Sequence, residues 1–107
     1  RLPSVEPWAA NLVEASVRTG QVEEAERWLA VLEDQAQATG LRSALAAAAR
    51  CRGLLVSDDN YEKEFATALE LQGDEMLFDR ARTQLCRGMR LRRARRRTDA
   101  RTALHDA

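Results

Sequence analysis

The chain has 107 residues, and its 17 basic and 17 acidic side chains give a formal net charge of zero. That length suits one small domain or a piece of a larger protein, and no apolar run approaches the roughly 20 residues of a membrane span. With only two cysteines, Cys51 and Cys86, the sequence does not suggest a disulfide framework. Nineteen alanines, no isoleucine and only two prolines favour helices throughout. We therefore expect an all-α, cytoplasmic protein without a signal peptide.

Three helices are predicted in the first half of the chain. The first spans residues 7–18, because proline suits a first helical turn, and it ends at Gly20. The second spans residues 21–38 and ends at Gly40, and the third, which is rich in alanine, spans residues 41–56. The expected inward side chains are Trp8, Leu12 and Ala15 in the first helix, Val22, Ala25, Leu29, Leu32 and Ala36 in the second, and Leu41, Ala44, Leu45, Ala48, Cys51 and Leu55 in the third.

Three more helices are predicted after the break at residues 57–60. Asp59 and Glu62 match a capping box for the fourth helix, so Asp58 and Asp59 are interpreted as capping residues rather than as paired catalytic carboxylates. Gly73 is expected to end that helix, and Asp74 to cap the fifth. Thr98 is expected to cap a sixth. The predicted inward positions are Tyr61, Phe65, Ala68 and Leu69 in the fourth helix, and Leu77, Phe78, Ala81, Leu85, Gly88 and Met89 in the fifth.

An internal repeat is visible in the short motif Cys-Arg-Gly. Cys51 and Cys86 lie 35 residues apart, as do Gly53 and Gly88. A glycine inside a helix costs about 1 kcal/mol relative to alanine, so both glycines are predicted to lie where two helices pack closely. The cysteines are interpreted as structural thiols. Together these features predict a single helical-repeat domain over residues 1–107, with repeats at 7–39, 41–72 and 75–107.

The segments "GQVEEAERWL" and "YEKEFATALEL" resemble degenerate tetratricopeptide repeats. The longer run "FDRARTQLCRGMRLRRARRRTDARTALHDA" is similar to the tetratricopeptide-like arm of large, ATP-binding, LuxR-family (MalT-like) bacterial transcription regulators. The resemblance implies about three antiparallel helix pairs in a short right-handed superhelix, within a fragment of a larger regulator. It also implies a segment that relays a signal or binds a partner protein, an adjacent domain or a small-molecule inducer. The nucleotide-binding and DNA-binding modules of that family have no counterpart here, so we expect no cofactor and no specific nucleic-acid binding.

Arginine is concentrated near the end of the chain. Residues 1–79 carry fifteen acids against seven bases, a net charge of −8, whereas residues 80–107 carry ten bases against two acids, a net charge of +8. On a helical wheel Arg92, Arg95 and Arg96 fall on the apolar face, and with Leu104 they form a candidate interaction surface. The arginines expected to point away from that face are Arg80, Arg82, Arg87, Arg90, Arg93 and Arg97. Solvation or pairing with acids, protein contact, and phosphate binding all remain open for them.

Three functions are compatible with these features. The first is a non-catalytic interaction or relay segment, because no serine–histidine or cysteine–histidine arrangement is recognisable. The alternatives are an arginine-rich nucleic-acid-binding domain and a free-standing tetratricopeptide-like adaptor. A terminal repeat without a following partner exposes apolar side chains, so self-association through the C-terminal end is also predicted.

Overall fold

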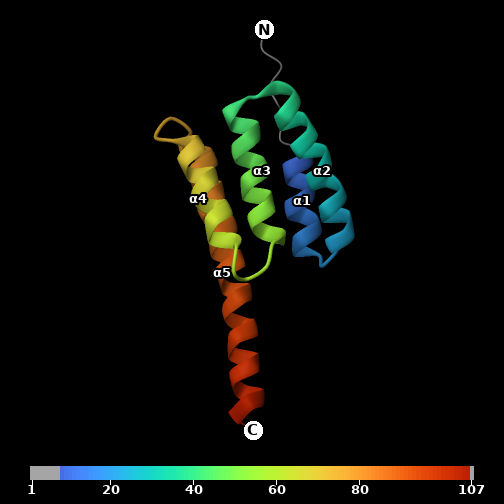
Figure 1. The fold of residues 1–107 in the computed structure, drawn as a ribbon, viewed down its shortest axis with the longest axis vertical. Coiled ribbons are helices and arrows are strands. Elements are labelled where there is room, and N and C mark those ends of the chain that lie inside the picture. Colours follow the sequence, from blue (N-terminus) through green and yellow to red (C-terminus); the bar gives the residue numbers. More distant parts are fainter. Residues whose placement is uncertain (1–7, 107) are drawn as a thin grey trace.

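The computed structural model describes residues 8–106, and every regular element among them is an α-helix. Figure 1 shows the five helices in chain order. They are α1 (Trp8–Arg18), α2 (Val22–Thr39), α3 (Arg42–Leu55), α4 (Tyr61–Gln72) and α5 (Leu77–Asp106). The all-α prediction is confirmed. Within residues 8–106, no helix combines the length and the apolar character that are needed to cross a membrane.

Helix α3 lies at the centre of the arrangement. Each helix packs against the next one along the chain, and α3 also contacts α1 and α5. The four shorter helices lie side by side, while the second half of α5 extends beyond them (Figure 1). This extension gives the molecule a longest dimension of 61 Å. The end of α5 therefore offers most of its sides to the surroundings.

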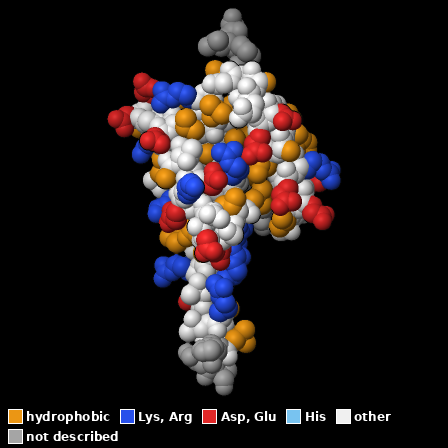
Figure 2. All heavy atoms as spheres, viewed as in Figure 1, with side chains coloured by type: hydrophobic (Ala, Val, Ile, Leu, Met, Phe, Trp, Pro, Cys, Tyr) orange, Lys and Arg blue, Asp and Glu red, His pale blue; other side chains and the backbone are white. Residues whose placement is uncertain are grey.

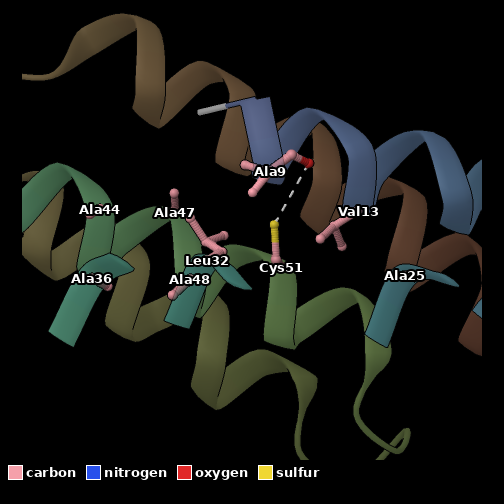
Figure 3. Close-up of a cluster of buried hydrophobic side chains, with 10 residues drawn as sticks. Ala9, Val13, Ala25, Leu32, Ala36, Ala44, Ala47, Ala48 and Cys51 are labelled. Atoms are coloured by element: carbon pink, nitrogen blue, oxygen red, sulfur yellow. Dashed lines mark hydrogen bonds between the residues drawn. The ribbon is translucent and has the colours of Figure 1, made fainter. Parts of the chain in front are cut away.

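The main core joins α1, α2 and α3, and it consists largely of small side chains (Figure 3). Alanines let α3 approach both neighbours closely, so that this helix is buried on several sides. Leu32 and Val13 are the largest fully buried apolar side chains in this cluster. Its buried members are Ala9, Ala10, Val13, Ala25, Leu32, Ala36, Ala44, Ala47, Ala48 and Cys51. A second cluster, formed by Leu54, Tyr61, Phe65 and Cys86, joins α3, α4 and α5.

The predicted stripe of α2 and the predicted turns agree with the structure. Ala25, Leu32 and Ala36 are buried, although Val22 is exposed. Gly40 has a positive φ of 65°, and its N–H donates to the carbonyl of Ala36 at 2.8 Å. Glycine adopts this left-handed conformation without the steric penalty of a side chain, which is why α2 ends there.

The predicted inward face of α1 is wrong. Trp8 is 45% exposed and Ala15 is exposed, whereas Ala9, Ala10 and Val13 are fully buried. Trp8 instead packs edge-on against Trp28 of α2, with the ring centroids 5.5 Å apart. Pro7, where the first helix was predicted to begin, lies outside the described residues.

The predicted fifth and sixth helices form one continuous helix, α5. Thr98 does not cap a new helix, because its hydroxyl donates to the carbonyl of Ala94 within α5 at 3.1 Å. No glycine or proline interrupts residues 89–106, and arginine and alanine favour helix continuation. The capping box is also wrong, since Asn60 holds the N-cap position of α4 without a side-chain capping bond. The prediction that Asp74 caps the fifth helix is also wrong, because α5 begins at Leu77 and its N-cap position is therefore residue 76.

The two repeated glycines occupy different environments. A β-carbon built on Gly53 would lie 2.6 Å from Cε2 of Phe65, so the predicted close packing of α3 against α4 is confirmed there. A β-carbon on Gly88 would meet nothing within 4 Å among the described residues, so the predicted helix contact at Gly88 is wrong. The repeat in sequence is therefore not a repeat in packing.

We predict opposite effects of alanine at these two glycines. Gly53→Ala forces the Phe65 ring to move and should destabilise the fold by about 1–3 kcal/mol. Gly88→Ala gains helix propensity in open space and should stabilise the fold by up to about 1 kcal/mol. Urea unfolding followed by circular dichroism measures both changes. Equal unfolding midpoints for the two variants would contradict the different surroundings of Gly53 and Gly88. As a control, adding Phe65→Leu to Gly53→Ala should recover part of the stability lost in Gly53→Ala.

Candidate functional site

Helix α5 contacts the rest of the protein through arginines and through a few apolar side chains, among them Met89, but the first half of the apolar face predicted to point inward points outward. Leu77, Phe78 and Leu85 are 73%, 92% and 71% exposed. Arg90, by contrast, is 1% exposed, and Thr83 and Cys86 are also buried. The predicted orientation of α5 about its own axis is therefore wrong, because acceptors on α1, α3 and α4 draw the arginines toward the bundle.

Glu14 of α1 is the carboxylate that joins three helices. Arg50 of α3 donates from Nε to Glu14 Oε2 at 3.0 Å, and both side chains are almost fully buried. Arg82 of α5 donates from Nη2 to Glu14 Oε1 at 3.1 Å, and it also contacts the Asn11 side-chain oxygen. Both carboxylate oxygens of Glu14 are thus occupied, which satisfies a charge that would be costly to bury alone.

Asp58, in the loop before α4, is the second acceptor for α5. Arg90 and Arg97 each donate to Asp58 Oδ1 at 2.5 Å, and Arg97 also donates from Nε to Oδ2 at 3.1 Å. Hydrogen bonds from Arg97 and Arg90 hold the pKa of the Asp58 carboxyl well below its usual range. The interpretation of Asp58 as a helix cap is therefore wrong, because its carboxylate binds these two arginines.

The other inward arginines of α5 also have acceptors. Arg87 donates to both carboxylate oxygens of Glu62 on α4, at 2.7 and 3.1 Å. Arg80 donates to the carbonyls of Leu69 and Gly73, and Arg93 donates to the carbonyl of Leu54 at 2.6 Å. Of the alternatives left open for these arginines, the structure shows pairing with acids for Arg82, Arg87, Arg90 and Arg97.

The opposite side of α5 carries the predicted interaction residues. Arg92, Arg95 and Arg96 are exposed, and they follow the exposed Phe78 and Leu85 on the same side of the helix. We call this surface the α5 outer face, and it comprises Phe78, Ala81, Leu85, Gly88, Arg92, Arg95 and Arg96. Figure 2 shows basic side chains gathered along the part of α5 that extends beyond the other helices. Leu104 is 78% exposed further along the extension, and self-association through that end stays a prediction.

Both cysteines are buried, Cys51 of α3 in the main core and Cys86 of α5 in the second cluster. Burial raises the pKa of the Cys51 thiol to about 12 and that of the Cys86 thiol to about 11. Cys51 points at the carbonyl of Ala10 of α1, with 4.0 Å between sulfur and oxygen (Figure 3). Thiols in this state are poor nucleophiles, which fits the structural role predicted for them. Among the described residues, no group of three or more histidine, cysteine or acidic side chains is placed to hold a metal ion.

Comparisons of this chain with protein-family models, curated proteins and solved structures found no match. The candidate site is therefore defined by geometry, as the two sides of α5. Sequence reasoning missed Glu14 and Arg50 as a pair. A signal was present, because Glu14 lies between Ala10 and Val17 on an otherwise apolar side of α1, and Arg50 directly follows an alanine run.

We predict that Glu14→Gln lowers the free energy of unfolding by about 3–5 kcal/mol, because it leaves the buried Arg50 guanidinium without a counter-charge. The matched control is Glu26→Gln on the exposed side of α2, which should change stability by no more than about 0.5 kcal/mol. Chemical denaturation of both variants provides the measurement. Similar losses in the two variants would show that net charge, rather than the ion pair, is responsible.

We also predict a stabilising contribution from Asp58 that depends on pH. Because the folded-state pKa is depressed, this contribution is complete above the ordinary aspartate pKa of about 3.9 and declines as the pH falls below it. The stability of the wild-type protein should therefore fall more steeply than that of Asp58→Asn between about pH 4 and pH 2. Thermal unfolding across this pH range tests the prediction. Parallel curves for the two proteins would refute it.

Proposed function

We propose that the chain is a non-catalytic protein-interaction or signal-relay segment, and that its contact surface is the α5 outer face. The observation that carries this proposal is the 92% exposure of Phe78 beside the exposed Leu77 and Leu85. Transferring such side chains from water into an interface is worth about 1.5–3 kcal/mol each. A large exposed apolar patch of this kind is typical of binding surfaces.

The spacing of the outer face favours a helical partner. Residues 78, 81, 85, 88 and 92 alternate steps of three and four, which is the pattern of a coiled-coil seam. Ala81 and Gly88 are small and open to solvent or partly so, which allows a neighbouring helix to approach closely. Gly88, which packs against nothing in the described chain, then has a packing role against the partner.

The charge of the outer face favours an acidic helix over a second copy of α5. Arg92, Arg95 and Arg96 follow the apolar half of the face, and Asp99 is the nearby acid that lines the same shallow hollow. Two α5 helices in parallel would oppose these arginines to each other, and two in antiparallel order would set them against Phe78 and Leu85. A partner helix with one apolar half and one acidic half can place its apolar side chains on the apolar half of the outer face and its acids on the arginines.

The resemblance to the tetratricopeptide-like arm of LuxR-family regulators is part of the same proposal. The order of contacts supports a helical repeat, since α3 lies between α1 and α5 while each also packs on its chain neighbour. In a stacked array, the exposed side of the last helix is where the next unit would pack. The partner would then be an adjacent domain of a cytoplasmic bacterial regulator or a separate protein.

The nucleic-acid alternative is less well supported. Four of the ten arginines of α5 are paired with acids within the protein, which lowers the positive charge that a nucleic-acid backbone would meet. No aromatic residue lies beyond Phe78, so bases would find no stacking platform near the arginines.

The test is binding of a synthetic amphipathic helix of about three heptads, with leucines on one side and glutamates placed to meet Arg92, Arg95 and Arg96. Fluorescence anisotropy at about 150 mM salt should show saturable binding that is lost when lysines replace the glutamates. Phe78→Ser with Leu85→Ser should abolish binding without lowering the melting temperature, because both side chains are exposed.

Two results would overturn the proposal. One is equal affinity of the wild-type protein and the double serine variant for the peptide. The other is a defined sequence motif selected from randomised duplexes at the same salt and lost in Arg92→Ala with Arg96→Ala. The second result would favour a nucleic-acid-binding domain, because contacts to phosphates alone select no sequence.

A further inference from the structure

A groove of about 670 Å³ lies on the bundle side of α5, where this helix leaves the other four. One wall is the row Arg90, Arg93, Arg97 and Arg101, and the α1–α2 turn and the end of α3 complete the groove. Its apolar lining comes from Val17, Val22, Leu54, Leu55 and Val56. The volume is within the range of small-molecule sites, and an apolar floor with a few convergent charges is their usual composition.

The groove has an excess of positive charge. Four arginines line it against one acid, Asp58, which gives a net charge of +3. Asp58 already binds Arg90 and Arg97. Arg93 has no carboxylate partner among the described residues, and its only hydrogen bond there is to the carbonyl of Leu54. Burial and the neighbouring charges of Arg90 and Arg97 lower the pKa of the Arg93 guanidinium.

Arg90 provides an independent observation. It is 1% exposed and lines the groove, yet its Nε and Nη1 atoms donate to no acceptor among the described residues. The Nε atom of Arg93 is unpartnered in the same way. The Arg90 guanidinium carbon lies 4.6 Å from the centre of the Tyr61 ring, which covers one face of the guanidinium group. This stacking contact does not give the N–H groups at the edge of the guanidinium an acceptor. Buried donors without acceptors cost free energy, and the charge of an anion bound in the groove would offset part of that cost.

We propose that this groove binds a small amphiphile, whose anionic head, a carboxylate or a phosphate, meets Arg93 and its neighbours while a short apolar chain lies over Val17, Val22 and Leu55. Guanidinium groups bind both kinds of anion through paired N–H bonds. The apolar lining favours a ligand with a hydrocarbon part over a free inorganic ion, because only the hydrocarbon part gains binding free energy by covering these apolar side chains.

The groove and the α5 outer face lie on different sides of the helix. Arg90, Arg93, Arg97 and Arg101 follow one another at steps of three and four, whereas Arg92, Arg95 and Arg96 fall between them in sequence and on the other side. Ligand binding in the groove therefore does not rest on the proposed function. Each can fail without the other.

The experiment titrates the full chain with octanoate, octyl phosphate, inorganic phosphate and neutral octanol, and follows binding by isothermal calorimetry. Octanoate and octyl phosphate should bind with measurable heat and with higher affinity than inorganic phosphate or octanol. The amphiphile with the higher affinity identifies the preferred head group. Arg93→Gln should weaken binding of the stronger ligand by about tenfold or more, whereas Arg93→Lys should weaken it less, because lysine keeps the charge but loses the paired N–H bonds. Arg95→Gln, with the same change in charge on the outer face, should leave the affinity unchanged.

If Arg93→Gln does not fold, Arg101→Gln replaces it, because Arg101 is exposed and lines the same groove. Val22→Ser, at a half-exposed floor position, should weaken octanoate binding without affecting the weak binding of inorganic phosphate. The proposal is overturned if neither amphiphile binds, if octanol binds as well as octanoate, or if Arg95→Gln has the same effect as the groove variants.

Discussion

The fold depends on one buried carboxylate, Glu14, which binds an arginine from each of two other helices. Arg50 positions α3 against α1, and Arg82 positions α5 against the same point. The surrounding core is mostly alanine, so each buried residue contributes little apolar area. In such a core, the requirement that buried charges remain paired restricts the helix arrangement more than apolar burial does. A rotation of α5 away from Glu14 would remove the Arg82 partner from one oxygen of this buried carboxylate and leave it to Arg50 alone.

This requirement explains why α5 presents its most apolar side to the surroundings. Arg82, Arg90 and Arg97 reach Glu14 and Asp58 only from the side on which they lie. Phe78 and Leu85 are on the opposite side and are therefore left exposed. Turning α5 to bury Phe78 and Leu85 would gain a few kcal/mol of apolar burial, but it would break the ion pairs of Arg82, Arg90 and Arg97 and leave one oxygen of the buried Glu14 without its arginine. The orientation of α5 thus follows from the larger of two competing terms, and the outer face is its consequence.

The features that could be predicted from sequence are those that depend on local pattern. The stripe of α2 and the turn at Gly40 each follow from residues within a few helical turns, and the contact at Gly53 joins two helices that are consecutive in the chain. The orientation of α5 could not be predicted in this way, because apolar periodicity was assumed to mark the buried side. The acceptors that decide it are distant in sequence: Glu14 lies 68 residues from Arg82, and Asp58 lies 39 from Arg97. The Cys-Arg-Gly repeat was misleading at Gly88 for the same reason. In the first copy Gly53 lies against Phe65, whereas in the second copy Gly88 contacts no side chain of another described helix.

The arginine-rich run of residues 88–97 therefore has two roles that its composition alone cannot separate. Arg90, Arg93 and Arg97 lie on one side, where they complete the contact between α5 and the bundle and line the groove. Arg92, Arg95 and Arg96 lie on the other side and extend the outer face. The opposite charges of the two parts of the chain, −8 and +8, explain how α5 is held, since Glu14, Asp58 and Glu62 neutralise inward arginines. What remains positive after this pairing lies at two places, the groove and the outer face. A single basic helix can in this way hold its contact with the bundle and line the groove with one side, and offer a separate set of arginines to an acidic partner on the other.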